Sequence, residues 1–132
     1  MSTIDATFST LPGTAAAVGV TGRHAVVVDR PEGRAGGRGL GLNGGQLLAL
    51  AIGGCLCNDV RYVADEQAIA IGGVSVDVSL TLDDTYVTGA TARVMVDVPA
   101  GVDAATLVEQ VAASSTVVLS LTRGIPIAVT PI

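Results

Sequence analysis

The sequence predicts a single α+β domain over residues 1–132, with the element order βββ–α–ββ–α–α–β. Three observations lead to this prediction: a long apolar helical segment in the middle, strand patterns near both ends, and a length that suits one domain. Hydrophobic residues make up 49% of the 132 residues and charged residues only 14%. Such an apolar composition in so short a chain indicates that another subunit covers part of the surface.

The first thirty residues predict a meander of two or three strands. Thr3–Ser9 alternates weakly, Thr14–Val20 is small and apolar, and His24–Asp29 is rich in β-branched residues. Pro12–Gly13 and Gly22 separate these segments as turns. We expect His24, the only histidine, to be a strand residue that faces solvent or the sheet edge.

Arg30–Gly45 is predicted to be a loop, since seven of its sixteen residues are Gly and one is Pro. It is either a flexible connector or a cover over a site at the start of the next helix. Its Gly-x-Gly spacings lack the strand–turn–helix context of a dinucleotide-binding fold, and no P-loop lysine follows them.

A long helix is predicted from Asn43, a plausible N-cap, to about Glu66. We expect it to end near Gln67–Ala70, with Gly72–Gly73 stopping it. Its first half is apolar on every side, which is typical of a helix buried against its own domain or a partner chain.

The strongest strand pattern is Val74–Leu82, in which apolar and polar residues alternate strictly. Tyr86–Val98 follows as its antiparallel partner, and the helix is expected to cover one face of the pair. Three elements are predicted to complete the chain: a helix from the cap Asp103 to about Ala113, a short helix Thr116–Thr122 between Ser114–Ser115 and Arg123–Gly124, and a last strand Ile125–Val129.

The composition argues against several partners. The net charge is −5, aromatic residues make up 2%, and the seven basic residues are all Arg, so we expect no nucleic-acid binding. The apolar run Leu47–Leu56 is too short for a membrane span, and the N-terminus lacks the pattern of a signal peptide. We therefore expect a cytoplasmic protein with reduced cysteines and no membrane partner.

Both cysteines, Cys55 and Cys57, lie in the predicted central helix. Residues two apart on a helix point about 200° away from each other, which disfavours a disulfide between them. Only His24 is available to join them as a metal ligand, so we predict no metal and no cofactor. Cys55 is either a reactive thiol or a buried small apolar residue, and Cys57 is expected to be structural.

Several strings resemble the OsmC/Ohr family, which comprises osmotically inducible protein C and the organic hydroperoxide resistance proteins. They are the strand and turn His24–Pro31, the Gly-rich loop around Gly36–Gly41, the helix Gln46–Cys55 with its Gly-Gly-Cys ending and its continuation through Arg61, Tyr62 and Ala64, and the closing segment Leu121–Ile127. Together they span almost the whole chain.

The resemblance implies an intertwined homodimer with two long apolar helices packed between sheets. It also implies thiol peroxidase chemistry, in which Cys55 attacks an organic hydroperoxide and a second thiol resolves the sulfenic acid. A nearby cation must keep such a nucleophile ionised. Arg23 matches the family's Gly-Arg string, and Arg30 or Arg38 are alternatives for this cation. Arg38 and Gln46 are candidates for substrate binding.

Two departures from the family pattern bear on function. Ser115 stands where the family has its second Cys, and Gly45 stands where the hydroperoxide-resistance branch has a Glu. The first hypothesis is therefore a one-Cys peroxidase that uses an external thiol reductant. The second is a non-catalytic member that binds an apolar small molecule at the dimer interface, and the third is a purely structural dimer.

Other roles weighed for the polar residues are mostly structural. We expect the Ser115 side chain to cap the following helix, and Asp59 to bond Asn58 or Arg61 at the helix surface. A carboxylate beside Cys55 would oppose formation of a thiolate. A hydrolase built from Ser115, His24 and Asp59 is conceivable, but no nucleophile-elbow string supports it.

Overall fold

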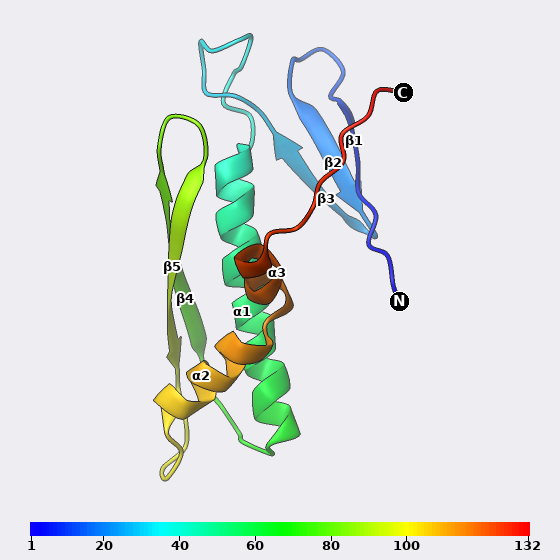
Figure 1. The fold of residues 1–132 in the computed structure, drawn as a ribbon. Helices are drawn as coiled ribbons and strands as arrows, with labels where there is room; N and C mark the ends of the chain where they lie inside the picture. The colour runs from blue at the N-terminus through cyan, green and yellow to red at the C-terminus, as the bar shows by residue number, and fades with distance from the viewer. The chain divides into compact units, whose positions relative to one another are not determined.

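The computed structural model describes residues 1–132 and divides them into two compact units, Met1–Leu48 and Ala49–Ile132. The first unit holds β1 (Thr7–Thr10), β2 (Ala17–Thr21) and β3 (His24–Val28). The second unit holds most of the long helix and both of the later helices (Figure 1). The α+β class and the element order are confirmed as far as the last helix.

The first unit is an antiparallel sheet in the order β1-β2-β3, so the predicted meander is confirmed with three short strands. A two-residue turn, Gly22–Arg23, joins β2 to β3, and Gly22 has a φ of 57°. A positive φ at this position is the reason that glycine suits the turn. His24 opens β3 and is exposed, as predicted.

The long helix α1 (Gly44–Glu66) begins at the predicted N-cap. Asn43 Oδ1 accepts the backbone N–H of Gln46 at 2.9 Å, and Gln46 Oε1 accepts the backbone N–H of Asn43 at 2.9 Å. This reciprocal capping box satisfies two N–H groups that a helix start otherwise leaves without partners.

The helix α1 ends at Glu66, as predicted, but it is stopped in a different way. Ala68 adopts a left-handed φ of 53°, its N–H donates to the carbonyl of Asp65, and the N–H of Ile69 donates to the carbonyl of Ala64. These two bonds form a Schellman motif, which ends the helix before the glycines are reached. The prediction that Gly72–Gly73 stops the helix is wrong, because both residues instead bond to Asp97 beyond β5.

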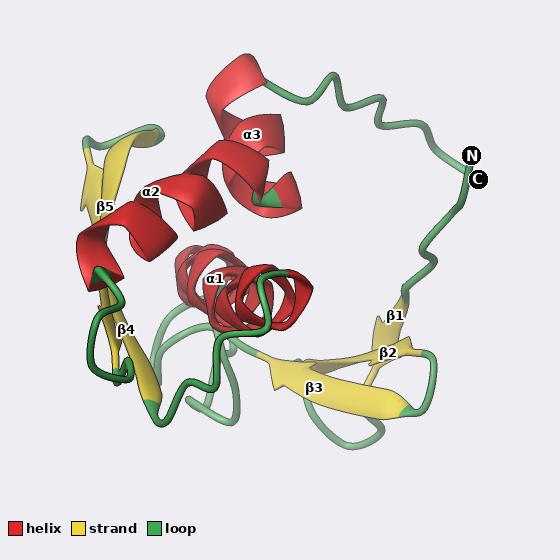
Figure 2. Cartoon of the chain, turned by 90° about the horizontal axis from the view of Figure 1, so that it is seen from below, coloured by secondary structure: helices red, strands yellow, loops and turns green.

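The second unit contains β4 (Val74–Leu82) and β5 (Val87–Val96), paired antiparallel, followed by α2 (Ala104–Ser114) and α3 (Thr116–Arg123). Asp103 caps α2 as predicted, accepting from the N–H groups of Ala105 and Thr106. In the two views, the β4–β5 hairpin runs beside α1, and α2 and α3 lie over another side of that helix (Figures 1 and 2).

Residues at four-residue spacing make the core of this unit. The buried stripe of α1 is Ile52, Leu56, Val60 and Ala64, and α2 contributes Leu107 and Val111. From Val74 to Leu80 the apolar side chains of β4 are half-buried while the polar residues are exposed, which fits a strand covered on one face. A Cβ added at Gly53 would meet Val78 at 3.2 Å, so the helix packs closely on this strand.

The predicted last strand, Ile125–Val129, is wrong for the single chain. Residues 124–132 belong to no helix or strand, and Ile127 and Val129 are 82% and 91% exposed. A strand needs a neighbouring strand to pair its backbone, and this segment takes part in no strand pairing.

By length and mean hydropathy, α1 could also cross a membrane, as could the bent pair α2–α3. The core helix of a soluble protein meets the same criteria. Four residues of α1 are buried against its own unit, and the rest of the helix is half-buried or exposed.

Candidate functional site

Cys55 lies on α1 one helical turn before Asp59, and the two side chains are in contact. The Cys55 thiol donates to Asp59 Oδ2 at 3.2 Å, and both residues are half-buried. Side chains four residues apart share one face of a helix, which explains the contact. The prediction that Asp59 bonds Asn58 or Arg61 is wrong, since its hydrogen-bonding partner is the thiol.

Ser115, which is distant in the sequence, also contacts Cys55. It stands at the bend of 56° between α2 and α3, and it is fully buried. Its side chain makes no capping bond to α3, so that prediction is wrong. Instead its hydroxyl donates to Cys55 Sγ at 3.5 Å. Cys55, Asp59 and Ser115 are called the Cys55 cluster below.

The Cys55 cluster has no cation from its own unit. The three arginines of residues 49–132 are Arg61, Arg93 and Arg123, and only Arg93 forms an ion pair, with the exposed Asp77. The other four arginines of the chain lie in the first unit. No ion pair therefore joins Asp59 of the Cys55 cluster to an arginine of its own unit.

The other candidate residues lie in the first unit. Arg23 is exposed in the β2–β3 turn, and Arg38 is exposed in the Gly-rich loop. Gln46 uses its side-chain carbonyl in the capping box of α1, which leaves its amide group as the free end. In the second unit, Cys57 is half-buried, and its thiol has no hydrogen-bonding partner in the structure.

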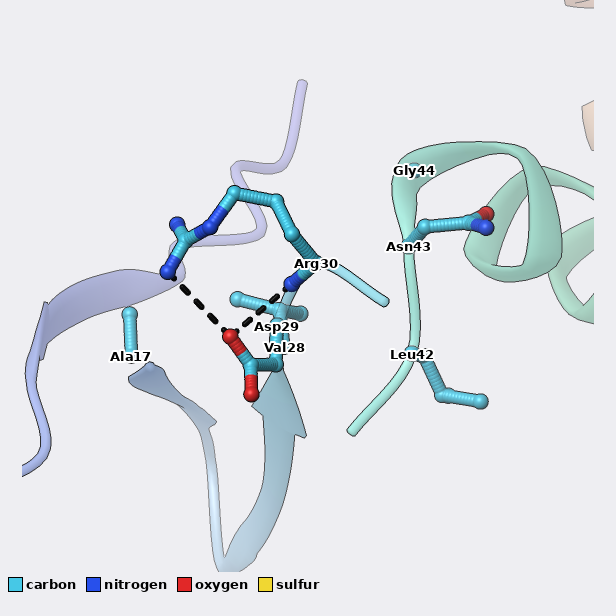
Figure 3. A pocket seen from close by; sticks show the side chains of 7 residues that line it. All are labelled: Ala17, Val28, Asp29, Arg30, Leu42, Asn43 and Gly44. Carbon is cyan, nitrogen blue, oxygen red and sulfur yellow. Dashed lines mark hydrogen bonds and ion pairs between the residues drawn. The ribbon is translucent and has the colours of Figure 1, made fainter. Parts of the chain in front are cut away.

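The Gly-rich loop is anchored by Asp29, a residue to which the sequence interpretation assigned no role in a site. The side chain of Asp29 is only 1% exposed. Oδ1 accepts the backbone N–H of Arg30 at 2.8 Å, and Oδ2 accepts those of Arg38 and Leu40 at 3.0 Å each. The Arg30 guanidinium lies 3.2 Å from Oδ1 (Figure 3).

These donors lower the pKa of Asp29, chiefly through the N–H groups of Leu40 and Arg38. The Gly-rich loop is therefore held by hydrogen bonds to Asp29 and is not a flexible connector. The sequence signal that could have identified this anchor is an Asp directly after a predicted strand and before a Gly-rich segment. A hollow of about 230 Å³ lies beside this anchor, lined by Ala17, Val28, Asp29, Arg30, Leu42, Asn43 and Gly44 (Figure 3).

No three His, Cys, Asp or Glu side chains gather as a metal site. What the Cys55 cluster offers is a thiol in contact with one carboxylate and one hydroxyl group. This arrangement defines the class as an α+β protein with a thiol site on its central helix.

The chain belongs to the OsmC family. The family model described as "OsmC-like protein" matches residues 36–130, which include most of the Gly-rich loop and the whole Cys55 cluster. No curated protein sequence matches the chain.

Solved structures agree with this assignment. The OsmC-like protein from Mycoplasma pneumoniae superposes with a TM-score of 0.75 at 14% identity, covering 92% of this chain and 88% of that one. The organic hydroperoxide resistance protein OhrB of Bacillus subtilis gives a TM-score of 0.58 at 24% identity, covering 92% and 91%. An organic hydroperoxide resistance protein from Legionella pneumophila gives 0.61 at 23%, covering 90% and 88%. At these identities the likeness establishes the fold.

Proposed function

We propose that the protein reduces organic hydroperoxides through Cys55, with an external thiol completing the cycle. The observation that carries this proposal is the contact between Cys55 and Ser115. Ser115 stands at the sequence position of the family's second Cys, and its hydroxyl points at the sulfur where a resolving thiol would be needed. The solved relatives named organic hydroperoxide resistance proteins support the choice of substrate.

The cycle has three balanced steps. The Cys55 sulfur attacks the terminal oxygen of a hydroperoxide ROOH, the O–O bond breaks, and the products are a sulfenic acid and the alcohol ROH. An external thiol then attacks the sulfenic sulfur, releasing water and leaving a mixed disulfide. A second external thiol attacks that disulfide and regenerates the Cys55 thiol.

An external thiol is required because a serine hydroxyl cannot act as a resolving thiol. Cys57 is a poor substitute, since it lies two residues along the same helix and points away from Cys55. We further propose that Arg23 supplies the positive charge beside Cys55, and that Arg38 and Gln46 orient the substrate.

A homodimer in the cytoplasm suits this chemistry. Exposed apolar side chains on α1 and at the C-terminus offer surface for a second copy, including Leu50, Tyr62, Ile127 and Val129. A single OsmC-like domain formed by residues 1–132 would then be the protomer. The reducing cytoplasm would supply the external thiol.

Stopped-flow oxidation with cumene hydroperoxide tests the proposal. Wild-type protein is expected to react at least about 100-fold faster than free cysteine, and Cys55→Ser to lose that reaction. Cys57→Ser is the matched control and should retain it. A wild-type rate equal to that of free cysteine, unchanged by Cys55→Ser, would contradict the proposal.

The alternative function is binding of an apolar small molecule at the dimer interface. The observation that favours it is the 59% and 68% exposure of Leu50 and Tyr62 on α1, together with a serine instead of a thiol at position 115. Native mass spectrometry of the purified protein would then show a dimer with a bound apolar compound. A dimer free of any bound compound would count against this function.

A further inference from the structure

The contact between Cys55 and Asp59 assigns a chemical task that the family's thiol pattern does not include. We propose that Asp59 takes the thiol proton of Cys55 as the sulfur attacks, and then delivers it to the alkoxide that leaves. This inference rests on the proposed hydroperoxide reduction, and it names the proton carrier of that reaction.

The geometry provides a continuous line of hydrogen bonds. The Ser115 hydroxyl donates to Cys55 Sγ at 3.5 Å, and the Cys55 thiol donates to Asp59 Oδ2 at 3.2 Å. Asp59 is therefore already within reach of the proton that must move, which is the first requirement for a general base. Ser115 donates to the same sulfur, and this second contact helps to hold the thiol in place beside Asp59.

The charge of Asp59 argues for proton transfer and against a stored thiolate. No arginine of residues 49–132 pairs with Asp59, so its charge has no counter-ion within that unit. A thiolate 3.2 Å from such a carboxylate would suffer strong repulsion. If the proton passes to Asp59 while the sulfur–oxygen bond forms, the two negative charges never coexist.

The reaction balances with Asp59 unchanged at its end. The sulfur of the thiol bonds to the terminal oxygen of ROOH, the O–O bond breaks, and RO⁻ departs with the electron pair. The thiol proton moves to Asp59 and then to RO⁻, which gives ROH. Cys55 becomes a sulfenic acid, and the hydroperoxide is the only oxidant consumed.

The test compares two peroxides whose leaving groups differ in their need for a proton. Cumene hydroperoxide releases an alkoxide, which must be protonated, while 3-chloroperoxybenzoic acid releases a carboxylate, which needs no proton. Asp59→Asn keeps the size of the side chain but cannot carry the proton. It should slow the reaction with cumene hydroperoxide about 100-fold, and that with the peroxy acid far less.

Asp65→Asn is the matched control, because Asp65 is an exposed carboxylate on the same helix and touches no part of the Cys55 cluster. It should react with both peroxides at the wild-type rate. Asp59→Glu should recover part of the lost rate with cumene hydroperoxide. If Asp59→Asn fails to fold by circular dichroism, Asp59→Ser replaces it in the same comparison.

Three outcomes are distinct. A wild-type protein no faster than free cysteine contradicts the proposed function itself, and the assignment of Asp59 with it. A fast wild type with an equally fast or faster Asp59→Asn overturns the role of Asp59 alone. An equal fall with both peroxides overturns proton delivery to the leaving group, because the lost step is then one that both peroxides share.

Discussion

Two carboxylates, Asp29 and Asp59, show how differently this chain uses the same side chain. Asp29 is nearly inaccessible and accepts three backbone N–H groups as well as the guanidinium of Arg30. Asp59 is half-buried and accepts only a thiol. A carboxylate whose oxygens are already occupied holds structure, and one with remaining capacity can exchange a proton. Asp29 is thus assigned to holding the Gly-rich loop, and Asp59 is the residue proposed to exchange a proton with Cys55.

The largest expected effect comes from Ser115→Cys, which changes the residue that contacts Cys55 alongside Asp59. The new thiol would lie where a hydroxyl already contacts Cys55 Sγ, so a hydroperoxide should join it to Cys55 in a disulfide and complete a two-Cys cycle. Closing a loop of about 60 residues should stabilise the oxidised protein by about 4 kcal/mol. Non-reducing peptide mapping detects the disulfide, and urea denaturation measures the stabilisation. The double variant Cys57→Ser/Ser115→Cys should give the same disulfide and the same stabilisation as Ser115→Cys. Persistent free thiols after oxidation would contradict the geometry of the cluster.

Asp29→Asn should affect stability and not the thiol. The amide cannot accept all the donors that Asp29 accepts, and its own NH₂ group would face them. We expect the melting temperature to fall by about 5–10 °C. Asp77→Asn, which removes only the exposed pair with Arg93, should change it by about 2 °C or less.

Asp59→Asn should behave in the opposite way to Asp29→Asn. It should keep the wild-type melting temperature and lose the reaction with cumene hydroperoxide. Equal melting temperatures for Asp29→Asn and Asp77→Asn would remove the structural role assigned to Asp29.

The difference between wild type and Asp29→Asn should depend on pH. Because the pKa of Asp29 is lowered in the fold, the unfolded chain binds the proton first as the pH falls. The stability from Asp29 is therefore fully present above its usual pKa of 3.8 and is lost as the pH falls through the lower, folded value. Asp83 and Asp103 also have lowered pKa values, but they are common to both proteins.

Urea denaturation from neutral pH down to about pH 2.5 measures this difference. The two unfolding free energies should converge in acid. A constant gap across this range would show that Asp29 stabilises the loop by some means other than its charge.

The smallest effect is expected from Ala68→Gly at the end of α1. Ala68 has a φ of 53°, a left-handed conformation that costs a residue with a Cβ about 1 kcal/mol relative to glycine. The substitution should stabilise the protein by about 0.5–1 kcal/mol in urea denaturation. Ala35→Gly, at a φ of 48° in the Gly-rich loop, is the counterpart in the first unit. A destabilised Ala68→Gly would contradict the assigned Schellman motif.

Much of the fold follows from local chemistry in the sequence. The caps Asn43 and Asp103 and the alternating strand Val74–Leu82 were predicted because each signal acts within a few residues. The end of α1 near Glu66 was also predicted, but the residue that stops it was not, because Ala68, which has no special preference for a left-handed φ, takes the place that glycine usually fills.

The site was predicted only in part, because its contacts join distant segments. The thiol Cys55 was identified as the candidate nucleophile, and Ser115 as the residue in the second-thiol position. That Ser115 would turn its hydroxyl toward Cys55 instead of capping α3 depends on the packing of α2 and α3 over α1. The four-residue spacing places Asp59 on the same face of α1 as Cys55. Whether Asp59 then bonds the thiol or water depends on how far the two side chains are buried.

The C-terminal segment shows a limit of a different kind. Ile125, Ile127 and Val129 alternate as in a strand, yet they have no neighbour in the single chain. A local pattern indicates that a segment can form a strand, but pairing requires a second backbone edge.

The most direct test of the central claim is to find which sulfur a hydroperoxide oxidises. Protein treated with one equivalent of cumene hydroperoxide in the presence of dimedone is digested, and the labelled cysteine is identified by mass spectrometry. The account predicts a sulfenic acid adduct on Cys55 and none on Cys57. An unlabelled protein, or equal labelling of both cysteines, would contradict it.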